Sequence, residues 1–322
     1  MRPLSQTQTL LFLFCLFSRA LFPQASSLQD IQRRAEAGDA KAQNELGVAY
    51  RLGDGVPRNK QEAVKWYRKA AMQGYADGLF NLGISYYNGD GGTTNEDIAY
   101  AWLLKAQAAG SKEADSAIGQ ITSNWKRWRF VDSALRIGDW YAKGDELPLD
   151  QTQALVWYRK AAEAGDSNGQ LKVCAALTFG LGTARIPEDA FRWCERSARQ
   201  GNADAIFAVA EKYERGIGVP QDFETAAQWY QKIGSSPEAA FRLARLYYAG
   251  NLVSKDELTK YAWLWIANNG SIPEASQMFA REFAKLDKKQ SRKAQELAAR
   301  LASSAQLYHV GLSPRPTRSA VK

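Results

Sequence analysis

The sequence predicts an all-α protein, an α/α superhelical solenoid of about six two-helix repeats closed by a C-terminal helical cap. The first observation is a period, because glycines recur at spacings of 36 or 33 residues in two series: Gly38, Gly74 and Gly110, then Gly165, Gly201, Gly234 and Gly270. The second is that the same phrases return between these glycines, as in VKWYRKAAMQG and LVWYRKAAEAG. Such a period is typical of repeat proteins, in which each unit buries its apolar face against its neighbours.

The N-terminal residues 1–25 are typical of a secretory signal peptide. Arg2 precedes an apolar run, Leu10–Phe17, and small residues follow, with Ser18 and Ala20 in the small-x-small arrangement of a cleavage site. The run is shorter than the roughly 20 apolar residues of a transmembrane helix. We therefore expect a periplasmic or secreted protein with no stable membrane insertion after cleavage. The alternative is that the segment is kept as an anchor.

Each repeat is expected to form two helices joined by a turn. In the first repeat Asp39 and Asn59 are placed to cap the two helices, because their side-chain oxygens accept hydrogen bonds from free backbone N–H groups. The turn GDGVP interrupts the helices, since Pro57 cannot continue one, and Gly74 ends the second. The repeats are expected near 39–74, 75–110, 130–165, 166–201, 202–234 and 235–270. The second capping position recurs as Asn95, Asp150, Asp222 and Asp256.

Small residues of the first helices are expected to face large residues of the second. Gly47 lies inside a helix, where glycine costs about 0.5–1 kcal/mol relative to alanine, so we expect Tyr67 to fill the space above it. In the fourth repeat these two positions are Cys174 and Cys194. An even pair of cysteines remains if the signal peptide is removed with Cys15. We therefore predict a disulfide between them, which an exported chain permits.

The predicted solenoid domain covers residues 26–306. Two segments within it and the segment that follows it depart from the period. Residues 111–129 are expected to form an extra helix and turn between the second and third repeats. Residues 271–306 have helical periodicity without the Trp-Tyr phrase, which predicts a terminal cap. Residues 307–322 are basic and are predicted to be a disordered tail.

The phrase LGVAYRLGDGVPRNKQEAVKWYRKAAMQG, residues 46–74, resembles the Sel-one-like repeat, a relative of the tetratricopeptide repeat. The resemblance covers most of 39–270. It implies an α/α superhelix and a protein-interaction role, which in bacteria is typical of exported adaptors and envelope scaffolds. We therefore expect an exported scaffold whose concave face binds an envelope or secreted partner, either another protein or an extended peptide.

In such superhelices the first helices line the concave side. Positions i, i+4, i+7 and i+11 of each first helix share one face and form what we call the first-helix stripe. The stripe is polar with mixed charge, as in Asp132, Arg136, Asp139 and Lys143 of the third repeat. A solvated helix face is the alternative interpretation. The candidate partner-binding residues are Asn81, Asn88, Arg136, Lys143, Arg215, Arg242 and Arg245.

The sequence contains no pattern that is typical of a catalytic site. The chain has one histidine, His309, so a Ser-His-Asp or Cys-His arrangement lacks a base, and two cysteines with one distant histidine do not make a zinc site. The glycine-rich turns lack the Lys-Ser/Thr of a phosphate-binding loop. We therefore predict no enzyme activity, with a hydrolase the least favoured function, and neither a metal nor a cofactor.

One basic-aromatic cluster, NWKRWRF at 124–130, supports an alternative function. Trp125, Trp128 and Arg127 could grip an anionic glycan, which would make the chain a glycan- or peptidoglycan-binding envelope module. The competing interpretation is that both tryptophans pack into the repeats while Lys126, Arg127 and Arg129 face water. Although the net charge is +8, no long Lys/Arg run exists, so nucleic acid is not an expected partner.

Overall fold

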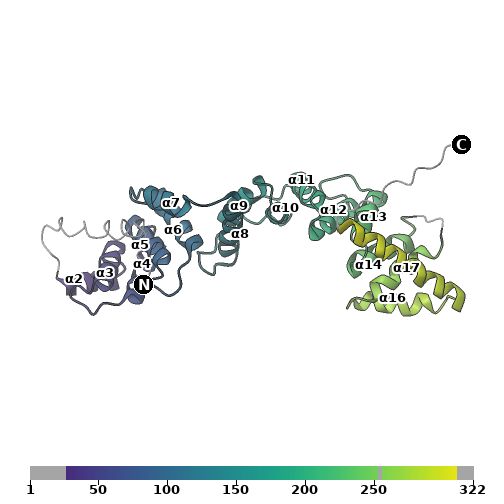
Figure 1. Cartoon of the computed structure of the whole chain (residues 1–322), viewed down its shortest axis with the longest axis horizontal. Coiled ribbons are helices and arrows are strands. Elements are labelled where there is room, and N and C mark those ends of the chain that lie inside the picture. Colours follow the sequence, from purple (N-terminus) through teal and green to yellow (C-terminus); the bar gives the residue numbers. More distant parts are fainter. Residues whose placement is uncertain (1–26, 253–255, 310–322) are drawn as a thin grey trace. The chain divides into compact units, whose positions relative to one another are not determined.

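The computed structural model describes residues 27–252 and 256–309, with side chains described to residue 304. The signal peptide predicted for 1–25 lies outside these residues, as does most of the tail predicted for 307–322. Residues 307–309 belong to the last helix instead of the tail. All regular secondary structure of the described residues is helical (Figure 1). The chain divides into two compact units, Met1–Pro148 and Leu149–Lys322. The predicted fold class, an α/α solenoid of two-helix repeats, is confirmed.

The helices of the first unit follow the predicted pairs up to residue 110 and are then interrupted by an insertion. Their bounds are α2 Leu28–Glu36, α3 Ala40–Leu52, α4 Lys60–Met72, α5 Ala76–Asn88, α6 Glu96–Ala108, α7 Ala114–Thr122 and α8 Arg127–Lys143. Consecutive helices pack on one another from α2 to α7, and α8 packs on α6.

The second unit contains the remaining repeats and the cap. Its helices are α9 Gln151–Glu163, α10 Ser167–Phe179, α11 Pro187–Arg199, α12 Ala203–Arg215, α13 Phe223–Lys232, α14 Pro237–Tyr248, α15 Thr259–Asn268, α16 Pro273–Phe283 and α17 Lys288–His309. Each helix from α9 to α15 packs on the next, so each two-helix repeat covers the apolar face of the one before it.

Five helices begin with a side-chain cap at a predicted residue. Asp39 accepts a hydrogen bond from the backbone N–H of Ala42 at 3.0 Å, and Asn59, Asn95, Asp150 and Asp222 cap the second helices of their repeats. The prediction for Asp256 is wrong, because α15 begins later, at Thr259. There the N–H of Thr259 donates to the Asp256 carbonyl and closes a turn before the helix starts.

The close approach predicted at Gly47 is present. A Cβ atom on Gly47 would lie 2.6 Å from Cε1 of Tyr67, whose side chain is fully buried. Gly83 has the same relation to Leu103 in the next repeat, at 2.8 Å. The Trp-Tyr phrase therefore contributes core packing between the two helices of a repeat.

The predicted disulfide joins Cys174 of α10 to Cys194 of α11. The two Cα atoms are 5.2 Å apart, and both side chains are buried. In the fourth repeat a covalent bond thus takes the place of the glycine–tyrosine contact of the first.

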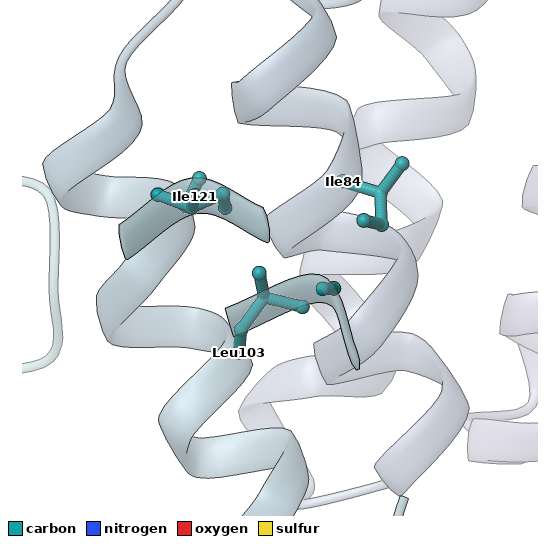
Figure 2. Close-up of a cluster of buried hydrophobic side chains, with 5 residues drawn as sticks. Ile84, Leu103 and Ile121 are labelled. Atoms are coloured by element: carbon teal, nitrogen blue, oxygen red, sulfur yellow. The ribbon is translucent and has the colours of Figure 1, made fainter. Parts of the chain in front are cut away.

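The insertion is shorter than the extra helix predicted over 111–129. It contributes α7, which ends at Thr122, while Arg127–Arg129 already belong to α8. Ile121 of α7 packs with Leu103 of α6 and Ile84 of α5 in one buried cluster, so α7 covers the face that the second repeat would otherwise leave open (Figure 2).

The cap has the register of a seventh repeat. Pro273, Glu274 and Ala275 open α16, one 36-residue period after Pro237, Glu238 and Ala239 open α14. However, α17 packs on α15 and α13, whereas the second helix of each complete repeat within a unit packs on the first helix of its own repeat. The cap is therefore an incomplete repeat.

Candidate partner-binding face

Some polar side chains of the first-helix stripe contact the preceding repeat. In the first unit Asn81 donates a hydrogen bond to Oδ1 of Asn44, which lies 37 residues earlier, at 2.8 Å. Asn88 and Lys143 are exposed at the ends of α5 and α8. Ile84 also belongs to the stripe by its register, yet it is buried beneath α7. The stripe is therefore interrupted by the insertion at this position.

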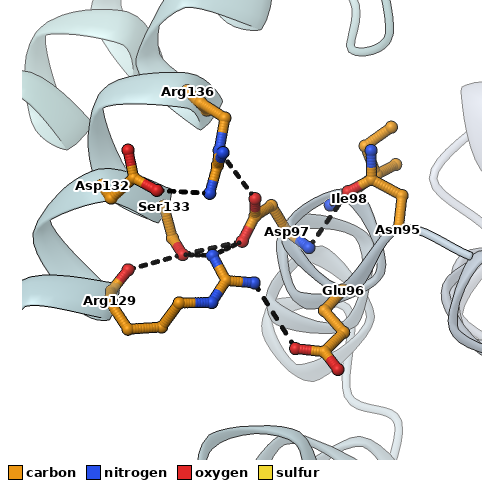
Figure 3. Close-up of polar contacts among 8 residues, drawn as sticks. All are labelled: Asn95, Glu96, Asp97, Ile98, Arg129, Asp132, Ser133 and Arg136. Carbon is orange, nitrogen blue, oxygen red and sulfur yellow. Dashed lines mark hydrogen bonds and ion pairs between the residues drawn. The ribbon is translucent and has the colours of Figure 1, made fainter. Parts of the chain in front are cut away.

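Arg136 is held by a cluster of charges at the start of α6. The buried carboxylate of Asp97 accepts Nη1 of Arg129 at 2.7 Å, Nε of Arg136 at 2.9 Å and the hydroxyl of Ser133 at 2.7 Å. Arg136 also pairs with Asp132, and Arg129 with Glu96 (Figure 3). The insertion separates these two helices in the sequence, and the cluster holds α8 on α6 together with Lys105 of α6, which lies over the ring of Tyr141 of α8.

A second cluster links the fifth and sixth repeats. Arg242 lies 3.3 Å from Oε1 of Glu211 and 3.5 Å from Oε1 of Glu214, and Arg215 pairs with Glu211 at 2.9 Å. The hydroxyl of Tyr230 donates to Glu214 at 2.7 Å, and burial raises the pKa of this tyrosine, so it remains a neutral donor. Arg215 and Arg242 are thus both engaged within the chain.

Arg245 differs from the other three candidate arginines. Within the described residues it has no carboxylate at salt-bridge distance, and its exposed guanidinium lies over the ring of Phe241, 6.0 Å from the centroid. Contact with the ring orients the group without neutralising its charge. Arg245 is therefore available to a ligand.

A groove lies where Arg245 is exposed. Its walls are one face of α14 with the following Ala249, and one face of α16; the lining residues are Phe241, Arg245, Tyr248, Ala249, Glu274, Gln277, Met278 and Arg281. Arg245 and Ala249 have the register of the first-helix stripe, at positions i+7 and i+11 from Glu238. Glu274, Met278 and Arg281 continue the stripe because they follow Glu238, Arg242 and Arg245 by 36 residues. These three residues lie beyond the six predicted repeats, and the repeated Pro-Glu-Ala is the signal in the sequence that relates them to the stripe.

The basic-aromatic cluster is divided by the structure. Trp125 packs edge-on against Tyr100, with ring centroids 5.0 Å apart, and Arg129 lies 4.8 Å above it. Trp128 is 67% exposed in the first turn of α8, next to the exposed Arg127. Neither sequence interpretation holds in full, since one tryptophan is packed, the other is free, and Arg129 is partly buried among carboxylates.

The described residues contain no group of three or more His, Cys, Asp and Glu side chains arranged to hold a metal ion. Within the same residues, no helix combines the length and the apolar character needed to span a bilayer.

The repeated helix pairs and the polar stripe on their first helices define a class of helical repeat scaffolds. Comparison with protein families identifies the family within this class. The model of the Sel1 repeat matches well over half of the chain, at residues 40–75, 76–111, 131–166, 167–202, 203–235 and 237–265. The chain belongs to the Sel1 repeat family. Sel1 repeats generally mediate protein–protein interactions, and the fold is an interaction scaffold without a catalytic centre of its own.

Solved structures show similar chains. One is a protective antigen present in uropathogenic Escherichia coli strains, with 25% identity, coverage of 89% of this chain and 67% of that one, and a TM-score of 0.46. Another is a Sel1 repeat protein from Oxalobacter formigenes, with 26% identity, coverage of 77% and 99%, and a TM-score of 0.38.

Proposed function

We propose that this chain is an exported scaffold without enzyme activity that binds an envelope or secreted protein through its first-helix stripe, with the groove between α14 and α16 as the main contact. The observation that carries the proposal is that five of the eight groove-lining residues have stripe register.

The proposed location is the periplasm or the exterior. The buried Cys174–Cys194 disulfide supports it, because structural disulfides persist in oxidising compartments and are rare in the cytosol. The signal-like residues 1–25 support it independently. Cell fractionation combined with thiol mapping tests this part, and recovery of the protein in the cytosol with two free thiols would overturn it.

Site-specific photocrosslinking in cells tests the binding surface. A photoreactive amino acid replaces Gln277, which is exposed in the groove, and in a matched variant it replaces Gln295, which is exposed on α17 outside the groove. We expect a discrete protein adduct from position 277 that is absent from position 295. Equal labelling at both positions, or none from 277, would contradict the proposal.

The exposed Trp128 supports a second candidate, a glycan-binding module. An exposed tryptophan beside Arg127 offers an apolar face and a charge to an anionic sugar. If this function is correct, purified peptidoglycan binds the wild type, and Trp128→Ala abolishes binding without a change in stability. Retained binding by that variant would exclude this surface.

A further inference from the structure

The groove between α14 and α16 combines two helix faces of related sequence register. Phe241, Arg245 and Tyr248 follow one another at helical spacing on α14, and Glu274, Gln277, Met278 and Arg281 do so on α16. Each face therefore exposes successive turns to the same hollow. Such a pair of faces suits an extended or helical segment better than a compact small molecule.

The groove offers apolar contact area together with cations. Phe241, Tyr248 and Met278 are only partly covered by the chain, and burial raises the pKa of Tyr248, which keeps its ring system uncharged. Aromatic residues and methionine are typical anchors of protein interfaces. A ligand segment would thus bury apolar side chains here.

Basic residues outnumber acidic residues around the groove. Arg245 has no carboxylate partner in the described chain, and Arg281, whose Nε pairs with Glu282 at 2.8 Å, keeps a 69% exposed side chain. The cap from 273 to 304 contains seven Lys or Arg residues against four Asp or Glu residues. Only Glu274 opposes this charge within the lining.

We infer that the groove recognises a segment of the partner protein in which an apolar side chain stands next to a carboxylate. The apolar side chain packs on Phe241 and Met278, and the carboxylate accepts hydrogen bonds from Arg245 and Arg281. An arginine fork matches a carboxylate in two parallel hydrogen bonds, which makes the contact selective. This inference rests on the proposed protein-binding function and specifies the chemistry of the partner.

Selection from a random linear peptide library displayed on phage, with the full chain as bait, tests the inference. Enriched peptides should combine Asp or Glu with a large apolar residue. Affinities of a synthetic winner are then measured by fluorescence anisotropy for the wild type, Arg245→Gln and Arg281→Gln. We expect each variant to lose about ten- to hundredfold in affinity, as is typical for a hydrogen bond between charged groups.

Two controls separate recognition from general charge. Arg300→Gln removes the same charge from an exposed position of α17 outside the lining and should leave affinity unchanged. Arg245→Glu should bind the same peptide with its carboxylate residue changed to Lys, because the charge pair is then restored in reverse. A merely structural role of Arg245 would not produce this rescue.

The outcomes are distinguishable from failure of the proposed function. Enriched peptides without acidic residues, or full affinity in Arg245→Gln, overturn the inference but leave a protein-binding scaffold. A library that enriches nothing argues against both. Binding of an acidic polysaccharide such as polygalacturonate that depends on Arg245, in the absence of peptide binding, would assign the groove to a glycan and overturn the inference.

Discussion

Replacing Gly47 by alanine tests whether close helix approach explains a glycine inside α3. The new Cβ would lie 2.6 Å from Cε1 and 2.7 Å from Cδ1 of Tyr67, both well inside van der Waals contact. Tyr67 is fully buried, so its ring cannot move into solvent. Overpacking of a well-packed core costs about 1–3 kcal/mol. Alanine recovers about 0.5–1 kcal/mol of helix propensity, so the net expectation is a loss of stability of roughly 1 kcal/mol.

Gly119 of α7 is the matched control in the same unit. A Cβ at this helical glycine would meet no atom within 4 Å, so Gly119→Ala should stabilise by about 0.5–1 kcal/mol. Because helix propensity contributes to both substitutions, their difference isolates the contact with Tyr67.

Urea unfolding followed by tryptophan fluorescence measures both free energies. Adding Tyr67→Leu to Gly47→Ala should relieve part of the loss, which a double-mutant cycle reports as a coupling energy. The reasoning is refuted if Gly47→Ala stabilises as much as Gly119→Ala, or if the coupling energy is zero.

Three further changes have defined expectations. The double substitution Cys174→Ala and Cys194→Ala should lower the free energy of unfolding by about 3 kcal/mol in the chain-entropy model. Urea unfolding measures this loss, and an unchanged midpoint of the urea transition would contradict a structural role of the disulfide. Asp97→Asn should lower the free energy of unfolding by about 1.5–3 kcal/mol, because it weakens two hydrogen bonds between charged groups. Hydrogen exchange of the backbone amides in α8 should become faster. Unchanged exchange would show that other contacts hold α8. The pKa of Glu282 is lowered by Lys285, which donates a hydrogen bond to it, so its contribution to stability is present above the ordinary carboxyl pKa and is lost as pH falls through the lowered value. Glu282→Leu should therefore reduce the loss of stability as pH falls below the ordinary carboxyl pKa of about 4.3, and an acid limb of wild-type steepness would contradict this assignment.

The sequence predicted those features that depend on local pattern. The period located the repeats that the family model matches, and the capping side chains followed from the residues before each helix. The disulfide was predictable because its two cysteines occupy the positions of Gly47 and Tyr67, a residue pair that is in close contact in the first repeat.

Features that depend on tertiary packing were not predictable. Ile84 has stripe register, but α7 lies over it, and nothing in the sequence of α5 specifies that cover. Asp256 has the residue type of a cap, but a turn intervenes before α15. The cap places α17 on α15 and α13, and this packing depends on contacts between distant segments of the chain.

The incomplete seventh repeat suggests how a binding surface can arise in a repeat array. When a repeat keeps its first helix but loses the aromatic phrase of its second, the second helix no longer packs on the first helix of the same repeat. Apolar side chains of the last first helices, such as Phe241 and Met278, are then left partly accessible. A new specificity can in this way evolve at the end of an array by loss of a few core residues, while the preceding repeats keep the stability of the fold.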